Sequence, residues 1–236
     1  MKRLTILFIM LVMLTSCQAA QPPIPPSLSE GEVAFATEDG IQLSGTVFGQ
    51  GTTAVVLAHM RSRDQTSWQP FAQVLAERGF TALTFDLRGY GQSGGDVDYT
   101  ALDKDARAAI AFLRDHGFQR IVCIGASMGG MACGKVSHEP GLAGLVIISS
   151  LRQAQVEGVS VYLSRSDFTD LTYPKLFIVC REDRPASGDV RGLYGWASEP
   201  KELKVFSGFA HGTDLFDTEY ADEFRELLVD FVANVD

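Results

Sequence analysis

A serine lies in the glycine-rich pentapeptide Gly125-Ala126-Ser127-Met128-Gly129, directly after the apolar run Ile121-Val122-Cys123-Ile124. The apolar run before it and the helix-compatible segment after it predict a tight turn from strand to helix, where a G-x-S-x-G pattern holds a nucleophile. Such a turn strains the serine backbone, and the flanking glycines let strand and helix pack closely. The N–H of Met128, at the start of the helix, would stabilise an oxyanion.

Two residues later in the chain could activate this serine. Asp183 follows the apolar segment 175–180, and His211 follows the apolar segment 203–206. His211 would take the proton from Ser127 and return it to the leaving group, while Asp183 would orient the imidazole and stabilise its protonated form. The neighbouring carboxylate of Glu182 is the alternative acid. We therefore predict Ser127, Asp183 and His211 as a catalytic triad.

With these residues, the chain resembles the α/β-hydrolase family over roughly residues 32–236. Besides the serine pentapeptide, the resemblance rests on residues 55–61 with Trp68, on the D-x-R-G-x-G-x-S stretch at 86–93, and on residues 174–183 with the turn 210–212. It implies a second oxyanion donor at Met60 or Arg61, where Met60 stands in place of the usual glycine. It also implies that His59 holds this loop through side-chain hydrogen bonds.

The coarse pattern of the chain is an alternation of strands and helices. An antiparallel pair (32–37 and 41–48) is followed by strands that end near residues 58, 85, 124, 149, 180 and 206, and by helices near 67–78, 101–116, 128–137 and 218–234. This alternation predicts an α/β fold with a mainly parallel, doubly wound sheet and a site at the carboxyl ends of its strands. The segment between Ser149 and Pro174, where relatives commonly insert a cap, is too short for a full cap domain.

The resemblance implies a serine hydrolase that acts through an acyl-enzyme, and we favour a carboxylesterase for small or short-chain esters. The alternatives are a peptidase or thioesterase on the same triad, and a non-catalytic envelope lipoprotein that uses the fold for binding. No metal or other cofactor is predicted, since no cysteine spacing is that of a zinc site. Arg61 and Arg63 are candidates for binding a substrate carboxylate, with pairing to a neighbour such as Asp64 as the alternative.

The N-terminus has the form of a secretion signal, with Lys2-Arg3 before an apolar stretch too short to span a bilayer. It ends in Leu14-Thr15-Ser16-Cys17, which resembles the lipobox of bacterial lipoproteins. We predict a signal peptide at 1–16, lipidation at Cys17, a proline-rich tether at 17–30 and one α/β-hydrolase domain at 31–236. The protein would be lipid-anchored in a bacterial cell envelope, with its catalytic domain outside the cytoplasm; the alternative is ordinary cleavage near Ala19-Ala20.

Composition narrows the set of partners. With 20 basic and 29 acidic residues the net charge is −9, which disfavours nucleic acid as a partner. The domain has three cysteines, an odd number that cannot all pair, and we predict Cys123, Cys133 and Cys180 as buried free thiols. His116 and His138 precede probable helix ends and are predicted to be structural.

Overall fold

The computed structural model describes residues 26–156 and 158–235 of the chain. The predicted signal peptide, the lipidation site at Cys17 and most of the tether lie outside the described residues and stay predictions. None of the helices in the described ranges is long and apolar enough to cross a membrane.

The strands are β1 (Gly31–Ala36), β2 (Gln42–Phe48), β3 (Thr53–Ala58), β4 (Thr81–Phe85), β5 (Arg120–Ala126), β6 (Leu142–Ile148), β7 (Gln153–Val156), β8 (Val159–Tyr162), β9 (Lys175–Cys180) and β10 (Lys201–Phe206). The helices are α1 (Gln69–Glu77), α2 (Leu102–Asp115), α3 (Met128–Lys135), α4 (Ala186–Trp196) and α5 (Ala221–Ala233), with short 3-10 helices η1 (Gln65–Ser67), η2 (Tyr99–Ala101), η3 (Arg165–Asp167) and η4 (Gly212–Asp217).

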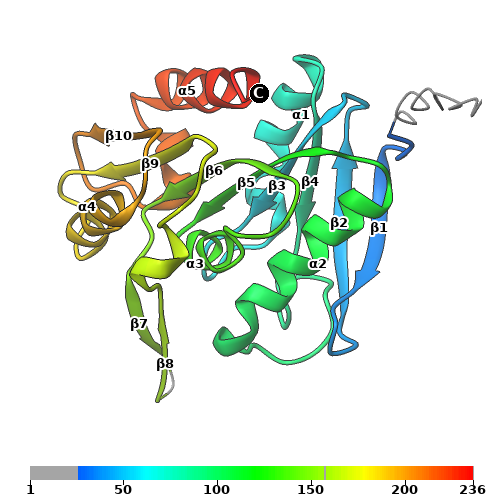
Figure 1. Ribbon diagram of the computed structural model, residues 1–236, viewed down its shortest axis with the longest axis horizontal. Coiled ribbons are helices and arrows are strands. Elements are labelled where there is room, and N and C mark those ends of the chain that lie inside the picture. Colours follow the sequence, from blue (N-terminus) through cyan, green and yellow to red (C-terminus); the bar gives the residue numbers. More distant parts are fainter. Residues whose placement is uncertain (1–25, 157, 236) are drawn as a thin grey trace, which may run out of the picture.

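Eight strands form one twisted sheet in the order β1-β2-β4-β3-β5-β6-β9-β10 (Figure 1). β2 is antiparallel to both β1 and β4, and all other neighbours are parallel. The central strands β5 and β9 are buried along almost their whole length, as expected for parallel strands covered on both faces. The α/β-hydrolase fold and its initial antiparallel pair are confirmed.

Helices cover both faces of this sheet, and each face has its own apolar core. On one face α2, α3 and α4 pack on the strands, with Leu113 and Leu193 fully buried. On the other face α1 and α5 pack through Leu75, Phe224 and Leu228. The parallel strands of this doubly wound arrangement direct their carboxyl ends to one edge of the sheet, where the loops after β3, β5, β9 and β10 lie.

A β-hairpin and a helix of the structure were not predicted from the sequence. The segment between β6 and β9 contains an antiparallel hairpin, β7–β8, that projects from the body of the molecule (Figure 1). Its strands are four residues long, too short to give a readable alternation of polar and apolar residues. The helix α4 contains Gly188, Gly192 and Gly195, which lower helix propensity and hide it from pattern analysis. No full cap domain is present in the described segment between β6 and β9, as predicted.

The prediction of three free thiols was wrong for two of them. Cys123 of β5 and Cys133 of α3 form a disulfide, with their Cα atoms 5.8 Å apart. Among the described residues Cys180 is the free cysteine; it is buried, and burial raises the pKa of its thiol to about 11. Strand position and an odd total could not reveal the pairing, because it depends on the chain reversal at Ser127 that folds α3 back against β5.

The packing of β5 against α3 gives a stability prediction. A Cβ at Gly125 would lie 2.1 Å from the backbone oxygen of Gly129, so Gly125→Ala is expected to lower the free energy of unfolding by about 3 kcal/mol. Gly188→Ala in α4 is the matched control, because nothing lies within 4 Å of a Cβ there and alanine is the better helix former. Urea denaturation measures both, and equal stability of the two variants would contradict the packing described here.

Candidate active site

Ser127 occupies the turn between β5 and α3 with a strained backbone. Its φ of 50° and ψ of −108° are rare for a residue with a side chain, and its N–H donates to the Ile148 carbonyl at 2.8 Å. A Cβ at Gly129 would lie 2.2 Å from the Ala58 carbonyl oxygen, so the start of α3 packs directly on the end of β3. The pattern of glycines around Ser127 therefore has the steric cause inferred from the sequence.

Asp183 and His211 meet at the ends of β9 and β10. The Nδ1 atom of His211 lies 2.9 and 3.0 Å from the two carboxylate oxygens of Asp183, which is buried, whereas the histidine side chain is 37% exposed. The hydrogen bond to Asp183 raises the pKa of His211 above its ordinary value, because the carboxylate favours the imidazolium. With Nδ1 bonded in this way, Nε2 is the ring atom left to exchange a proton.

Glu182, the alternative acid, has a different contact. Its carboxylate accepts from the Gly208 N–H at 2.7 Å, and its own N–H donates to the Gly208 carbonyl at 3.1 Å. These bonds join the loop after β9 to the loop that leads to His211. Of the two neighbouring acids, the structure thus brings Asp183 to the histidine and gives Glu182 a loop-holding contact.

The histidine loop packs against the serine turn. Gly212 has a positive φ of 57°, and a Cβ at that position would lie 3.2 Å from the Ala126 Cβ and 2.7 Å from the Met60 sulfur. The residue after His211 therefore contacts the residue before Ser127 and one predicted oxyanion residue. Loops from β3, β5 and β10 converge at this point, which is the geometry a triad with an oxyanion site requires.

His59 fixes the turn that holds Met60 and Arg61. Its buried ring donates from Nδ1 to the Met60 carbonyl at 2.9 Å and accepts from the Leu87 N–H at Nε2, at 3.0 Å. Burial lowers the pKa of His59, so the neutral ring that this pattern needs is favoured. The Met60 carbonyl also accepts from the Arg63 N–H, and Ser62 has a φ of 64°, so residues 60–63 form a closed turn with Arg61 at its corner. The loop-holding role expected for His59 agrees with these bonds.

A second set of polar residues holds the loop after β4. The Asp86 carboxylate accepts from the Gln65 N–H, the Gln65 amide and the Gln92 N–H at 2.8 to 3.0 Å. Arg88 is buried and donates to Asp105 and Asp39. In the sequence, residues 86–93 are visible only as a family pattern, which gives no partner for Asp86 or Arg88.

Ser127 lines a cavity of about 240 Å³, which lies between the turn at Arg61, helix α3 and the β7–β8 hairpin. This volume lies below the about 300–1,000 Å³ that is common for ligand pockets. Tyr99 and two glutamines of the hairpin were not predicted as site residues, and no motif marks them in the sequence. The lining residues are Arg61, Tyr99, Leu102, Ser127, Met128, Met131, Leu151, Gln153, Ala154, Gln155 and Val161.

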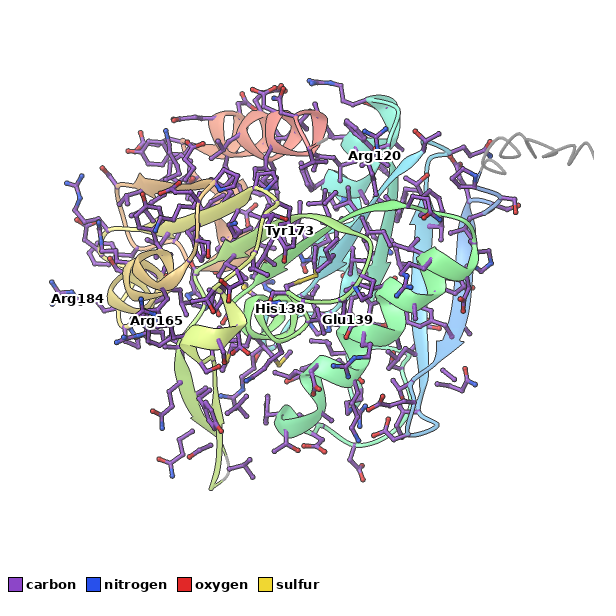
Figure 2. The ribbon with its side chains drawn as sticks, in the orientation of Figure 1. Arg120, His138, Glu139, Arg165, Tyr173 and Arg184 are labelled. Carbon is purple, nitrogen blue, oxygen red and sulfur yellow. A yellow bond between two sulfur atoms is a disulfide. The ribbon has the colours of Figure 1, made fainter. Side chains whose placement is uncertain are left out.

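The two remaining histidines lie outside this cavity. His116 follows α2 and bonds through Nδ1 to the Phe112 carbonyl at 2.7 Å. His138 bonds through Nε2 to the Ser166 carbonyl of η3 at 2.9 Å, and Figure 2 labels His138 near the middle of the view. Both therefore have local structural contacts. In residues 26–156 and 158–235, no cluster of three or more His, Cys, Asp or Glu side chains is arranged to hold a metal ion.

Proteins of similar sequence and solved structures of similar fold are known. A model of the Alpha/beta hydrolase family matches residues 55–235. The uncharacterized protein YfhR of Escherichia coli K12 is 28% identical over 236 aligned residues, which cover 88% of this chain and 82% of YfhR. Among solved structures, the esterase Pf2001 of Pyrococcus furiosus superposes with a TM-score of 0.76 at 19% identity, covering 88% of this chain and 93% of that one. The esterase EaEST of Exiguobacterium antarcticum gives a TM-score of 0.70 at 16% identity, with 86% and 99% covered.

The contact between His211 and Asp183 predicts a measurable titration. Proton NMR of the histidine rings is expected to give His211 a pKa above 6.5, because the carboxylate stabilises the charged ring. Asp183→Asn removes that negative charge and should lower the pKa of His211, whereas the matched change Glu182→Gln should leave it nearly unchanged. If the pKa of His211 changes in Glu182→Gln and not in Asp183→Asn, Asp183 is not the residue that raises it.

Proposed function

The chain belongs to the alpha/beta hydrolase family, and we propose that it is a serine hydrolase, specifically a carboxylesterase for small or short-chain esters. One observation carries the proposal. A serine on a strained turn lines a cavity, in a fold whose adjoining loop holds a histidine bonded through Nδ1 to a buried aspartate. These are the parts that nucleophilic acyl transfer needs, namely a nucleophile, a base and a group that orients the base.

In the proposed acylation step, the Ser127 oxygen attacks the ester carbonyl while its proton passes to Nε2 of His211. The carbonyl oxygen becomes an oxyanion, for which the Met128 N–H and an N–H of the turn at Met60 and Arg61 are the proposed donors. The tetrahedral intermediate then collapses. The bond to the leaving alcohol breaks, the alcohol takes the proton from His211, and the acyl group stays on Ser127.

Deacylation repeats these steps with water as the nucleophile. His211 removes a proton from water, and the resulting hydroxide attacks the acyl-enzyme carbonyl. Collapse of the second tetrahedral intermediate breaks the bond to the Ser127 oxygen, which regains the proton from His211, and the carboxylic acid leaves. In both steps the Asp183 side chain orients the ring and stabilises the imidazolium that forms twice in each cycle.

The cavity supports small substrates. Its walls include the apolar side chains of Leu102, Met131 and Val161, and its volume is about 240 Å³. An acyl chain longer than the cavity would leave methylenes in solvent, where each gains little of the ~0.8 kcal/mol that full burial supplies. The substrate class that follows is an ester of a short acyl chain.

For its location, we propose a protein lipidated at Cys17 and held at a membrane of the bacterial cell envelope, with the catalytic domain outside the cytoplasm. The leader pattern that ends at Cys17 supports this proposal. The Cys123–Cys133 disulfide supports it independently, because disulfides persist mainly in oxidising compartments. Several acyl chains on one cysteine would hold the protein to a membrane without a spanning helix.

Substitution of the triad residues tests the activity. Ser127→Ala is expected to abolish ester hydrolysis, and Asp183→Asn to lower kcat by about 10⁴-fold, because the imidazole loses its orienting partner. Glu182→Gln is the matched control, since its side chain contacts the Gly208 N–H, and should lower kcat less than about tenfold. Esters, thioesters and aminoacyl amides are assayed in parallel with each variant. Hydrolysis that survives in Ser127→Ala would rule out this nucleophile.

Cell fractionation tests the location. The wild-type protein is expected in the membrane fraction and in the detergent phase after phase separation, because its acyl chains partition into lipid. Cys17→Ala should release the protein or leave its leader uncleaved. A mature wild-type protein that begins after residue 17 and stays in the aqueous phase would disprove the anchor.

A further inference from the structure

Two arginines of the turn after β3 differ in their contacts. Arg63 donates to Asp214 of η4 at 2.9 Å, so its charge is already paired. Arg61 has no carboxylate partner among the residues that the structure describes, and its guanidinium lies 5.9 Å from the centre of the Tyr99 ring. Asp64, the neighbour that could have paired with either arginine, instead caps η1 through its bonds to Thr66. The positive charge of Arg61 is therefore not neutralised by a described carboxylate.

Arg61 is held in place at its backbone and at its side chain. Its backbone lies at the corner of the closed turn that His59 fixes. Its guanidinium lies over Tyr99, an arrangement that stabilises a cation at a fixed position. The Tyr99 hydroxyl in turn lies 3.2 Å from the hydroxyl of Tyr90, whose ring packs against His59. The same histidine thus supports the turn and, through two tyrosines, the aromatic surface under the guanidinium.

Among the residues that the structure describes, the lining of the cavity at Arg61 includes Ser127 and no acidic residue. Gln153 and Gln155 of β7 also line the cavity; they are two positions apart and share one face of that strand. Amide N–H groups and a guanidinium can all donate to a carboxylate, and the guanidinium can do so with two parallel hydrogen bonds. An anion bound here would not need to displace an existing ion pair.

We propose that this site prefers esters whose acyl chain ends in a free carboxylate, and that the Arg61 side chain binds that carboxylate. The ester carbonyl would lie at Ser127 and the carboxylate at Arg61, with the apolar walls around the methylenes between them. The products are then a short dicarboxylic acid and an alcohol. The proposal rests on the proposed function for its reaction, and adds to it the class of acyl group.

The net charge of the whole protein does not favour anionic substrates, so a preference for them has to arise in the cavity. With a net charge of −9, the protein repels small anions at long range, so an anionic substrate gains no general electrostatic attraction. Any preference for anionic esters must come from local groups in the cavity, and Arg61 is the cation among the described residues that line it. Substitution of Arg61 should consequently remove the preference, and substitution of the paired Arg63 should not.

The test compares two esters of equal length. One is the monomethyl ester of glutaric acid, and the other is the methyl ester of glutaramic acid, in which a primary amide replaces the free carboxylate. The ratio of their kcat/KM values is measured for the wild type, Arg61→Gln, Arg61→Lys and the matched control Arg63→Gln. We expect the wild type to prefer the anionic ester about tenfold, a size typical of a hydrogen bond to a charged group. The ratio should fall close to one in Arg61→Gln, fall partly in Arg61→Lys, which keeps the charge without the planar fork, and stay as in wild type in Arg63→Gln.

A binding measurement separates this inference from the proposed reaction. Isothermal titration of the same two esters, monomethyl glutarate and methyl glutaramate, into the Ser127→Ala protein needs no turnover, and the anionic ester should bind about tenfold more tightly unless Arg61 is also replaced. If neutral esters are hydrolysed but the anionic preference is absent, or is unchanged in Arg61→Gln, the inference about Arg61 is overturned while the serine hydrolase stands. If no ester is hydrolysed, the proposed function fails and the titration decides alone: tighter binding of the anionic ester that depends on Arg61 supports the inference, and equal binding of the two esters overturns it.

Discussion

The site depends on one steric constraint, the lack of space between β3, β5 and α3 around Ser127. A Cβ at Gly125 would clash with the Gly129 carbonyl, and one at Gly129 would clash with the end of β3. Because both glycines lack a side chain, the chain can reverse within one residue, and Ser127 takes the positive φ that this reversal requires. The Cys123–Cys133 disulfide links the same strand to the same helix, so the reversal is closed by a covalent bond as well as by packing.

Around this turn the polar contacts hold loops rather than take part in chemistry. His59 links the end of β3 to the chain after β4, Asp86 holds the start of η1, and Glu182 joins the loops after β9 and β10. Arg88, a buried cation, belongs to the same loop after β4 as Asp86. Burial disfavours its charge, but hydrogen bonds to Asp39 and Asp105 outweigh that effect and raise the pKa of Arg88, while the bond from Arg88 lowers the pKa of Asp39. The loops after β3, β9 and β10, which carry proposed site residues, are thus held by polar contacts.

Local constraints made much of the fold readable from the sequence, and long-range contacts account for what was missed. The strand before Ser127 and the glycines around it report a clash within a few residues, so the turn could be predicted. The physical basis for preferring Asp183 to Glu182 is long-range, since Asp183 contacts His211, 28 positions away, and Glu182 contacts Gly208, 26 positions away. The pairing of Arg63 with Asp214 spans 151 positions and could not be foreseen, nor could the hairpin β7–β8, whose strands are too short to show a period. The disulfide was missed for a related reason, since it follows from how α3 folds back and not from cysteine count.

The central claim is that Ser127 is an activated nucleophile, and covalent labelling tests it most directly. A fluorophosphonate reacts with a serine whose proton is removed by a neighbouring base, and the adduct can be located by peptide mass spectrometry. We expect one adduct, on Ser127, that forms at neutral pH and fails to form when His211 is replaced by alanine. An intact protein that takes up no probe, or an adduct on another residue, would contradict the assignment of Ser127 as the nucleophile.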